Sequence, residues 1–291
     1  MNILVTGATG YLGRALIEKL VKGNNNITAL VRKSSNIRLL ESYMPANRFY
    51  HIENSLDCIF DEIDIDLIIN CIVCYQRANE SVKEVIDSNV LIPVQLMELA
   101  AKKKKCTFLN IGTSLPRGVA SYSLSKSQLV EWGRFYSTNN GMQFININAE
   151  YFFDANEPDN RFVKMIATKL VRNVPYIELT AGEQKRDFIY LSELLSALNK
   201  IIDKMSLLDR YESIDIGTGK AIKIKDFVEK MKEISGSTTE LKFGVISTRA
   251  NEPNICQADI TKLHELGWEP LLSIEKSLNK LIDDIRNKKA N

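Results

Sequence analysis

Glycines near the start of the chain place the strongest constraint on its fold. The segment Thr6–Gly13, with sequence TGATGYLG, joins a β-branched run, Ile3–Thr6, to an amphipathic stretch, Tyr11–Lys22. The spacing of apolar residues predicts a strand for the run and a helix for the stretch. A glycine-rich turn between them lets the backbone approach a pyrophosphate at the helix N-terminus. We therefore expect a dinucleotide-binding turn made of Gly7, Thr9, Gly10, Tyr11, Leu12 and Gly13.

The first half of the chain continues to alternate strand and helix patterns. Helices are expected over residues 79–105 and 121–138, and further strands at Ile27–Val31, Tyr50–Ile52, Leu67–Cys71, Phe108–Ile111 and Gln143–Ile147. Strands joined by right-handed helical crossovers form a parallel sheet that is covered on both faces. The fold class is therefore α/β, with a Rossmann-type doubly wound parallel sheet.

From about residue 153 the alternation becomes less regular, which predicts a smaller α/β C-terminal substrate lobe. We expect residues 1–152 to form the dinucleotide-binding domain, with the segment at about 183–216 returning to it. Residues 153–182 and 217–291 are then expected to form the lobe.

Composition narrows the function classes. Lys plus Arg is 38 and Asp plus Glu is 36, a net charge of +2, which lacks the basic excess typical of nucleic-acid binding. No apolar run approaches the roughly 18 residues of a membrane helix, and the start of the chain does not have the pattern of a signal peptide. Five scattered cysteines indicate a reducing compartment, so we expect a cytoplasmic protein. With only two histidines, no metal site is expected.

The end of the second strand carries Arg32, Lys33 and Ser34. An acidic residue at this place would hold the adenosine ribose hydroxyls of NAD, whereas a guanidinium and hydroxyls suit a 2′-phosphate. The sequence therefore predicts a preference for NADPH.

Tyr122 and Lys126 lie four residues apart in a predicted helix, so both side chains face the same way. An ammonium close to a phenol lowers the pKa of the phenol and makes it a usable proton donor near neutral pH. The pair follows the fifth strand of a nucleotide-binding sheet, which makes a catalytic role the preferred interpretation.

Together, T-G-x-x-G-x-x-G at residues 6–13 and Y-x-x-x-K at 122–126 resemble the extended short-chain dehydrogenase/reductase superfamily, the NAD-dependent epimerase/dehydratase type. Further matching segments lie at Asn89-Val90, Gln184–Tyr190, Ile216–Gly219, Arg249–Pro253, Ala258–Lys262 and Leu266–Pro270. The resemblance covers nearly the whole chain.

The resemblance implies a role for each matched residue. Tyr122 would donate the proton, Lys126 would hold the nicotinamide ribose, and Thr113 would bond the substrate oxygen, with Ser114 as the alternative. Arg186 and Arg249 match arginines that hold a nucleotide diphosphate, because a guanidinium pairs with phosphate in two places. Tyr151, in the segment Glu150–Phe153, is expected to line the substrate pocket or to be buried in packing.

Departures from the family pattern indicate the reaction. Sugar-nucleotide dehydratases place Asp-Glu after the active-site threonine, whereas Ser114-Leu115 stands here and supplies no carboxyl group for elimination. The short connection from Thr113 to Tyr122, which contains Leu115-Pro116-Arg117-Gly118, resembles the CDP-abequose and CDP-paratose synthase branch. This implies NADPH-dependent reduction of the C4 ketone of a nucleoside-diphosphate 4-keto-6-deoxyhexose, with CDP favoured, for surface polysaccharides such as the lipopolysaccharide O-antigen.

Two other functions remain open. One is a nucleotide-sugar 4-epimerase that retains its NAD(P), and the other is a non-enzymatic protein that senses NADP. The wide apolar faces of the helices at 79–105 and 121–138, which include Val90 and Trp132, also imply a homodimer. Packing of these faces on the sheet is the alternative explanation for them.

Overall fold

The computed structural model describes residues 1–77, 79–102, 106–248 and 251–290. They form two compact units. Unit 1 contains Met1–Asn148 and Lys204–Ile214, and unit 2 contains Ala149–Asp203 and Asp215–Asn291. Of the segment at about 183–216 that we expected to return to the first domain, residues 204–214 belong to unit 1 and residues up to 203 belong to unit 2. No helix among the described residues is both long enough and apolar enough to cross a membrane.

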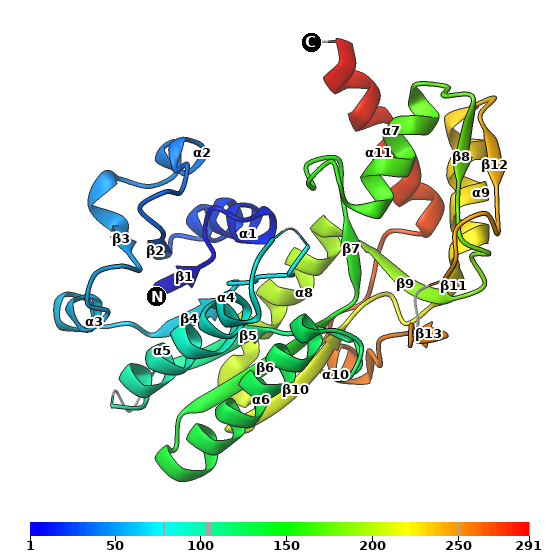
Figure 1. Cartoon of the computed structure of the whole chain (residues 1–291). Helices are drawn as coiled ribbons and strands as arrows, with labels where there is room; N and C mark the ends of the chain where they lie inside the picture. The colour runs from blue at the N-terminus through cyan, green and yellow to red at the C-terminus, as the bar shows by residue number, and fades with distance from the viewer. Residues whose placement is uncertain (78, 103–105, 249–250, 291) are drawn as a thin grey trace. The chain divides into compact units, whose positions relative to one another are not determined.

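Unit 1 is built on a seven-stranded sheet with strand order β10-β6-β5-β4-β1-β2-β3 (Figure 1). Its strands are β1 (Asn2–Thr6), β2 (Asn26–Val31), β3 (Phe49–His51), β4 (Leu67–Asn70), β5 (Thr107–Ile111), β6 (Gln143–Ala149) and β10 (Tyr211–Ile216). The pairs from β3 to β6 are parallel. The strand order reverses between β1 and β4, which confirms the doubly wound fold and places the crevice of such folds at the carboxyl ends of these strands.

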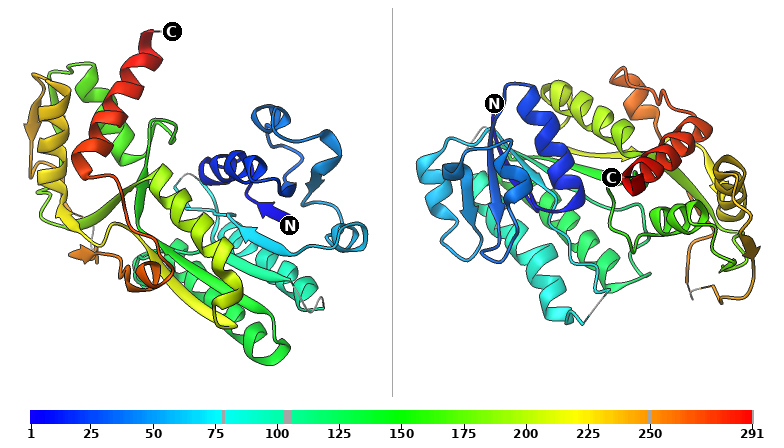
Figure 2. Two further views of the ribbon diagram at one scale, coloured as in Figure 1. Left: turned by 180° about the vertical axis from the view of Figure 1, so that it is seen from behind. Right: turned by 90° about the horizontal axis from the view of Figure 1, so that it is seen from above.

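The helices of unit 1 lie on both faces of the sheet, with α1 on one side and α5 and α6 on the other (Figures 1 and 2). They are α1 (Tyr11–Lys22), α2 (Arg38–Glu41), α3 (Asp57–Glu62), α4 (Val82–Ile86), α5 (Ile92–Ala101) and α6 (Ser121–Asn140), with 3₁₀ turns η1 (Ala46–Arg48) and η3 (Met205–Leu207). The core between the sheet and α5 and α6 contains Phe108, Phe144 and Leu129, all fully buried. Burial on both faces explains why the strands read as apolar runs.

The helix expected over 79–105 is interrupted. It begins at Val82, because Ser81 and Glu84 form a capping box at its N-terminus. Between α4 and α5 lies one π-helical segment, η2 (Asp87–Leu91). Such π-turns in proteins often occur at functional sites. The last residues of the expected helix, 103–105, lie outside the described residues.

Unit 2 has its own sheets and helices. A four-stranded sheet contains β7 (Tyr151–Phe153), β9 (Lys185–Tyr190), β11 (Ala221–Lys223) and β13 (Ile255–Cys256), and β8 (Tyr176–Glu178) pairs with β12 (Glu240–Lys242). The helices are α7 (Phe162–Val171), α8 (Leu191–Lys204), α9 (Ile224–Ser235), α10 (Thr261–Glu265) and α11 (Ile274–Ala290).

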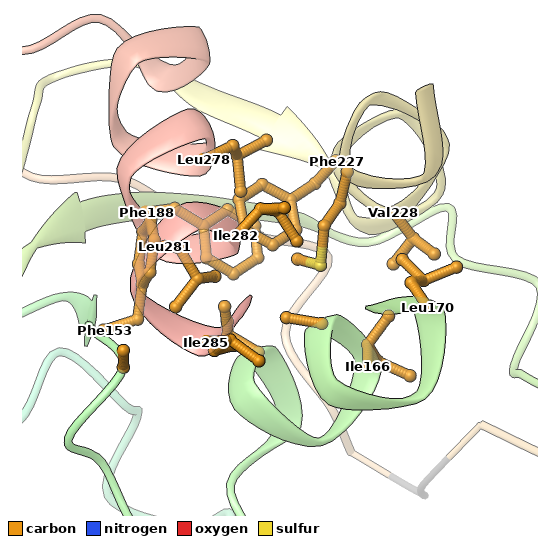
Figure 3. Packing of buried hydrophobic residues seen from close by; sticks show 14 of the residues in the cluster. Phe153, Ile166, Leu170, Phe188, Phe227, Val228, Leu278, Leu281, Ile282 and Ile285 are labelled. Atoms are coloured by element: carbon orange, nitrogen blue, oxygen red, sulfur yellow. The ribbon is translucent and has the colours of Figure 1, made fainter. Parts of the chain in front are cut away.

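A separate apolar core holds unit 2 together. Figure 3 shows side chains from α7, α9 and α11 gathered around the rings of Phe188 and Phe227. These two rings stack with their centroids 3.8 Å apart at an interplanar angle of 11°. The pair joins β9 to α9 within this core.

Candidate active site

The glycine-rich turn between β1 and α1 has no room for side chains. Gly7 has a φ of +62°, and a Cβ on it would lie 2.6 Å from the carbonyl oxygen of Cys71. A Cβ on Gly13 would lie 2.3 Å from the carbonyl oxygen of Gly7. Both positions therefore require glycine, because an added methyl group would push the backbone segments apart.

The N-terminus of α1 follows Gly10, an N-cap residue that supplies no side-chain hydrogen bond to the first turn. Gly10 is exposed, and Thr9 and Tyr11 are half-buried. A bare backbone and the positive end of a helix dipole together fit a pyrophosphate. The turn thus fits the dinucleotide cofactor that the sequence predicts.

The basic turn after β2 is exposed at Arg32, Lys33 and Ser34. The backbone N–H of Arg32 donates to Ser35 Oγ at 3.2 Å. The backbone N–H of Lys33 donates to both carboxylate oxygens of Glu53, at 3.2 and 3.1 Å. Sequence reasoning missed Glu53, which comes from the segment after β3 and brings a negative charge to this basic turn.

Tyr122 and Lys126 lie in the first turns of α6. The ring of Tyr122 lies 4.8 Å from that of Tyr75, centroid to centroid. Lys126 is 3% exposed, and its Nζ donates to the carbonyl oxygens of Ile72 (3.0 Å) and Ile111 (2.9 Å). Burial lowers the pKa of Lys126 to about 8, because the charged form is poorly solvated there.

Thr113 and Ser114 follow β5. Thr113 Oγ1 accepts a hydrogen bond from the backbone N–H of Leu115 at 3.2 Å, which leaves the hydroxyl proton able to donate. A cavity of about 460 Å³ lies beside this loop within unit 1, and its lining includes Thr113 and Lys126 but neither Ser114 nor Tyr122. Arg117, Trp132, Asn148 and Ser213 also line it.

Asn89, in the π-helical segment, ties two parts of the site together. Its side chain accepts from the backbone N–H of Cys74 (2.7 Å) and donates to the carbonyl oxygen of Cys74 (2.9 Å) and to Ser125 Oγ (2.9 Å). Asn89 is fully buried. It therefore fixes the loop after β4 against the helix that carries Tyr122 and Lys126.

The substrate residues expected in the second half of the chain lie in unit 2. Tyr151 is half-buried on β7, with its ring 5.4 Å from that of Phe188. Arg186 is buried on β9, and its Nη2 pairs with Glu252 Oε1 at 2.7 Å. Arg249 lies outside the described residues. A cavity of about 390 Å³ in this unit includes Glu252 and Gln184 in its lining.

Asp187 connects two of the segments that match the family. Its buried carboxylate accepts from the backbone N–H groups of Thr218 (2.8 and 3.0 Å) and Gly219 (2.9 Å). A Cβ on Gly217 would lie 2.5 Å from Asp187 Oδ2. The matched segments Gln184–Tyr190 and Ile216–Gly219 are therefore held together by the Asp187 carboxylate.

Sequence reasoning also missed a row of buried polar residues in the central sheet, Thr6, Asn70, Asn110 and Asn146. Asn70 is the one polar residue of β4, whereas β1, β5 and β6 each contain at least one further polar residue, so no single strand marks the row in the sequence.

Three features define a nucleotide-binding protein of the Rossmann class. The strand order of the parallel sheet reverses at β1, and Gly10 at the start of α1 supplies no side-chain cap. Lys126 is buried near the carboxyl ends of β4 and β5. The NAD dependent epimerase/dehydratase family matches residues 3–217, and the chain belongs to this family. Curated relatives cover its full length. CDP-abequose synthase of Salmonella typhimurium is 26% identical, over 96% of this chain and 97% of its own. CDP-abequose synthase of Salmonella muenchen is 28% identical, over 97% of both chains.

The fold is also that of solved members. The UDP-glucuronic acid 4-epimerase of Bacillus cereus, in complex with UDP-glucuronic acid and NAD, superposes with a TM-score of 0.84. The two chains are 20% identical, and the similarity covers 99% of this chain and all of the epimerase. This likeness confirms the Rossmann-type architecture.

Proposed function

We propose that this protein is an NADPH-dependent nucleotide-sugar 4-ketoreductase. Its substrate would be a nucleoside-diphosphate 4-keto-6-deoxyhexose, with CDP as the favoured nucleotide, in surface-polysaccharide sugar biosynthesis. The observation that carries the proposal is the buried Lys126 on α6, whose Nζ is held by the carbonyl oxygens of Ile72 and Ile111 near the carboxyl ends of β4 and β5, one helical turn from Tyr122. The full-length similarity to two CDP-abequose synthases supports the choice of sugar class.

The residues present fit a nicotinamide dinucleotide. The turn Gly7–Gly13 and the N-terminus of α1 would hold its pyrophosphate, Arg32, Lys33 and Ser34 would hold the 2′-phosphate, and Lys126 would hold the nicotinamide ribose. When bound, the cofactor supplies the hydride for the C4 carbon. The protein binds and orients both reactants.

The protein's own side chains handle the proton. Tyr122 donates its phenolic proton to the C4 oxygen, so the ketone becomes a secondary alcohol and the phenolate recovers a proton from solvent. Thr113 donates a hydrogen bond to the same oxygen and stabilises the charge that develops there. Thr113 is preferred to Ser114 because only Thr113 lines the cavity with Lys126.

A 4-epimerase with retained NAD is the second candidate. The observation in its favour is Glu53, whose carboxylate accepts from the backbone of Lys33 and would oppose a 2′-phosphate. Reduction is preferred because Arg32 and Lys33 themselves carry positive charge at this turn. Ser114-Leu115 after Thr113 argues against a dehydratase, since neither residue supplies a carboxyl group.

We further propose a cytoplasmic homodimer whose lobe holds the sugar nucleotide. Arg186 and Arg249 would bind its diphosphate, and Tyr151 would contact the sugar. Exposed apolar side chains on α6, namely Leu124, Trp132 and Phe135, support self-association through this helix.

The test is NADPH oxidation with a panel of CDP-, dTDP-, UDP- and GDP-linked 4-keto-6-deoxyhexoses. We expect oxidation with the CDP sugar, and the Tyr122→Phe variant should lose at least about 100-fold in turnover while still binding NADPH. An inverted configuration at C4 of the sugar without net oxidation of NADPH would identify the epimerase. Binding of NADPH without any turnover would favour a sensing protein.

A further inference from the structure

Four polar residues cross the central sheet at one level. Thr6 on β1, Asn70 on β4, Asn110 on β5 and Asn146 on β6 are Cα partners in successive parallel pairs. Their side chains form a continuous chain of hydrogen bonds of 2.7, 2.9 and 2.8 Å. We call these four residues the asparagine ladder.

The asparagine ladder is not expected to make the protein more stable than apolar residues at the same positions would. Thr6, Asn70 and Asn110 are 0% exposed and Asn146 is 2% exposed, and their neighbours along the strands, such as Val5, Ile69, Leu109 and Ile145, are buried and apolar. A buried amide costs about 1–3 kcal/mol if it is unpaired, and a paired set contributes little more than apolar residues of the same shape. A parallel sheet covered on both faces ordinarily uses valine, isoleucine and leucine at such positions.

The ladder lies next to the groups that hold Lys126. Asn110 directly precedes Ile111, and Asn70 is two residues before Ile72; the carbonyl oxygens of these two isoleucines accept from Lys126 Nζ. An ammonium has three N–H donors, so two are committed to backbone carbonyls and one remains.

The same row also lies against the loop that carries Thr113. A Cβ on Gly112 would lie 2.8 Å from Asn146 Oδ1, so the residue just before Thr113 packs on the ladder without room for a side chain. The backbone N–H of Gly112 donates to the carbonyl oxygen of Ile147 at 2.7 Å.

We propose that the asparagine ladder is a positioning network for Lys126. It fixes where β4 ends relative to β5 along the strand direction. The side chain of Asn70, the last residue of β4, is hydrogen-bonded to that of Asn110, the next-to-last residue of β5. The carbonyl oxygens of Ile72 and Ile111 are thereby held at one separation, and the third N–H of Lys126 keeps one direction. The inference rests on the proposed function only in taking the nicotinamide ribose as the acceptor of that third N–H.

The chain supplies a matched control. Thr107 Oγ1 donates to Gln143 Oε1 at 2.9 Å, which joins the same strands, β5 and β6, three residues nearer their N-terminal ends. Asn110→Leu removes the ladder bonds, and Thr107→Val removes this remote bond with a similar change in chemistry.

Cofactor affinity is the readout, measured by fluorescence titration with whichever of NADPH and NADH binds the wild-type protein more tightly. Asn110→Leu should weaken binding about 10-fold, the size of effect seen when a supporting residue behind a ligand group is removed. Thr107→Val should stay within about twofold. Asn110→Ser, which replaces the amide by a shorter polar hydroxyl group, is the second variant if Asn110→Leu does not fold.

The decisive comparison repeats both substitutions in a Lys126→Met background. If the ladder acts through Lys126, Asn110→Leu should change affinity less than twofold there, because the group it positions is gone. Unchanged affinity in the single variant, or the same 10-fold loss in both backgrounds, would overturn the inference. Turnover of a sugar nucleotide does not enter this cycle, so the ladder and the proposed reaction fail independently.

Discussion

Gly133 of α6 packs directly against the ring of Phe144 on β6. A Cβ on residue 133 would lie 2.3 Å from Cε1 and Cζ of that ring, and both residues are buried. This contact sets how closely the helix that carries Tyr122 and Lys126 approaches the sheet.

Gly133→Ala should therefore destabilise the protein by about 1–3 kcal/mol, because the overlap forces α6 or the ring to move. It should also lower the proposed reductase activity, since Lys126 moves with the helix. Urea unfolding and turnover measure the two effects. Gly118→Ala is the control, because nothing lies within 4 Å of its Cβ, and it should change stability by less than about 0.5 kcal/mol. Equal effects of the two variants would contradict the role given to this contact.

Lys126 should make stability depend on pH. Its folded pKa of about 8 is below its ordinary 10.5, so between these values the unfolded chain binds more protons than the folded protein. Stability must then rise with pH across this window, and burial of the charge costs most below pH 8.

The measurement compares wild type with Lys126→Met, which removes the titration. From pH 7 to pH 10 the free energy of unfolding of the wild type should rise by about 2 kcal/mol relative to the variant. A constant difference between the two proteins would mean that Lys126 titrates normally. Under the proposed function, turnover should also fall above pH 8 as the ammonium loses its proton.

Cofactor preference should respond to the charges at the turn after β2. Arg32→Asp should move preference from NADPH toward NADH, because it places a carboxylate where the 2′-phosphate would lie. Glu53→Gln should act in the opposite direction, since it removes the negative charge that accepts from the Lys33 backbone. The ratio of kcat/KM for the two cofactors measures both. A ratio that neither substitution changes would leave the NADPH assignment without support.

Self-association should depend on the exposed aromatic pair on α6. Trp132 and Phe135 are in edge-to-face contact, with centroids 5.9 Å apart, although both remain about half exposed. Light scattering at micromolar concentration should give twice the chain mass of 33.0 kDa. Replacing both residues by serine should yield a monomer, whereas Leu207→Ser, at an exposed apolar residue of η3, should leave the dimer intact. A wild-type monomer would refute the dimer.

Local patterns were enough to predict the β1–turn–α1 unit. The strand, the glycines and the helix of this unit are neighbours in sequence. Other backbone atoms come so close to Gly7 and Gly13 that only glycine fits at these positions. The helix that carries Lys126 was also predicted from its pattern, whereas the role expected for Lys126 stays a prediction.

Other features depend on contacts that sequence spacing does not reveal. The Arg186–Glu252 pair joins residues 66 positions apart, and Glu53 reaches the turn of Lys33 from the segment after β3. The asparagine ladder could not be predicted because its members lie in four different strands, and only the parallel register aligns them. The π-helical segment was missed because its hydrogen bonds span one residue more than those of an α-helix, and the spacing of apolar residues over so short a segment does not reveal that difference.

The last strand of the main sheet has a consequence for synthesis on the ribosome. β10 completes the sheet beside β6, yet residues 145–209 separate Phe144 and Arg210, whose backbones hydrogen-bond at the start of this pairing. While that intervening chain is being made, the nascent first unit exposes the bare edge of β6, and open edges recruit other strands. At about 5–20 residues per second, this interval lasts several seconds. A chaperone that covers strand edges would therefore be needed most after residue 149 has emerged and before residue 216 has followed.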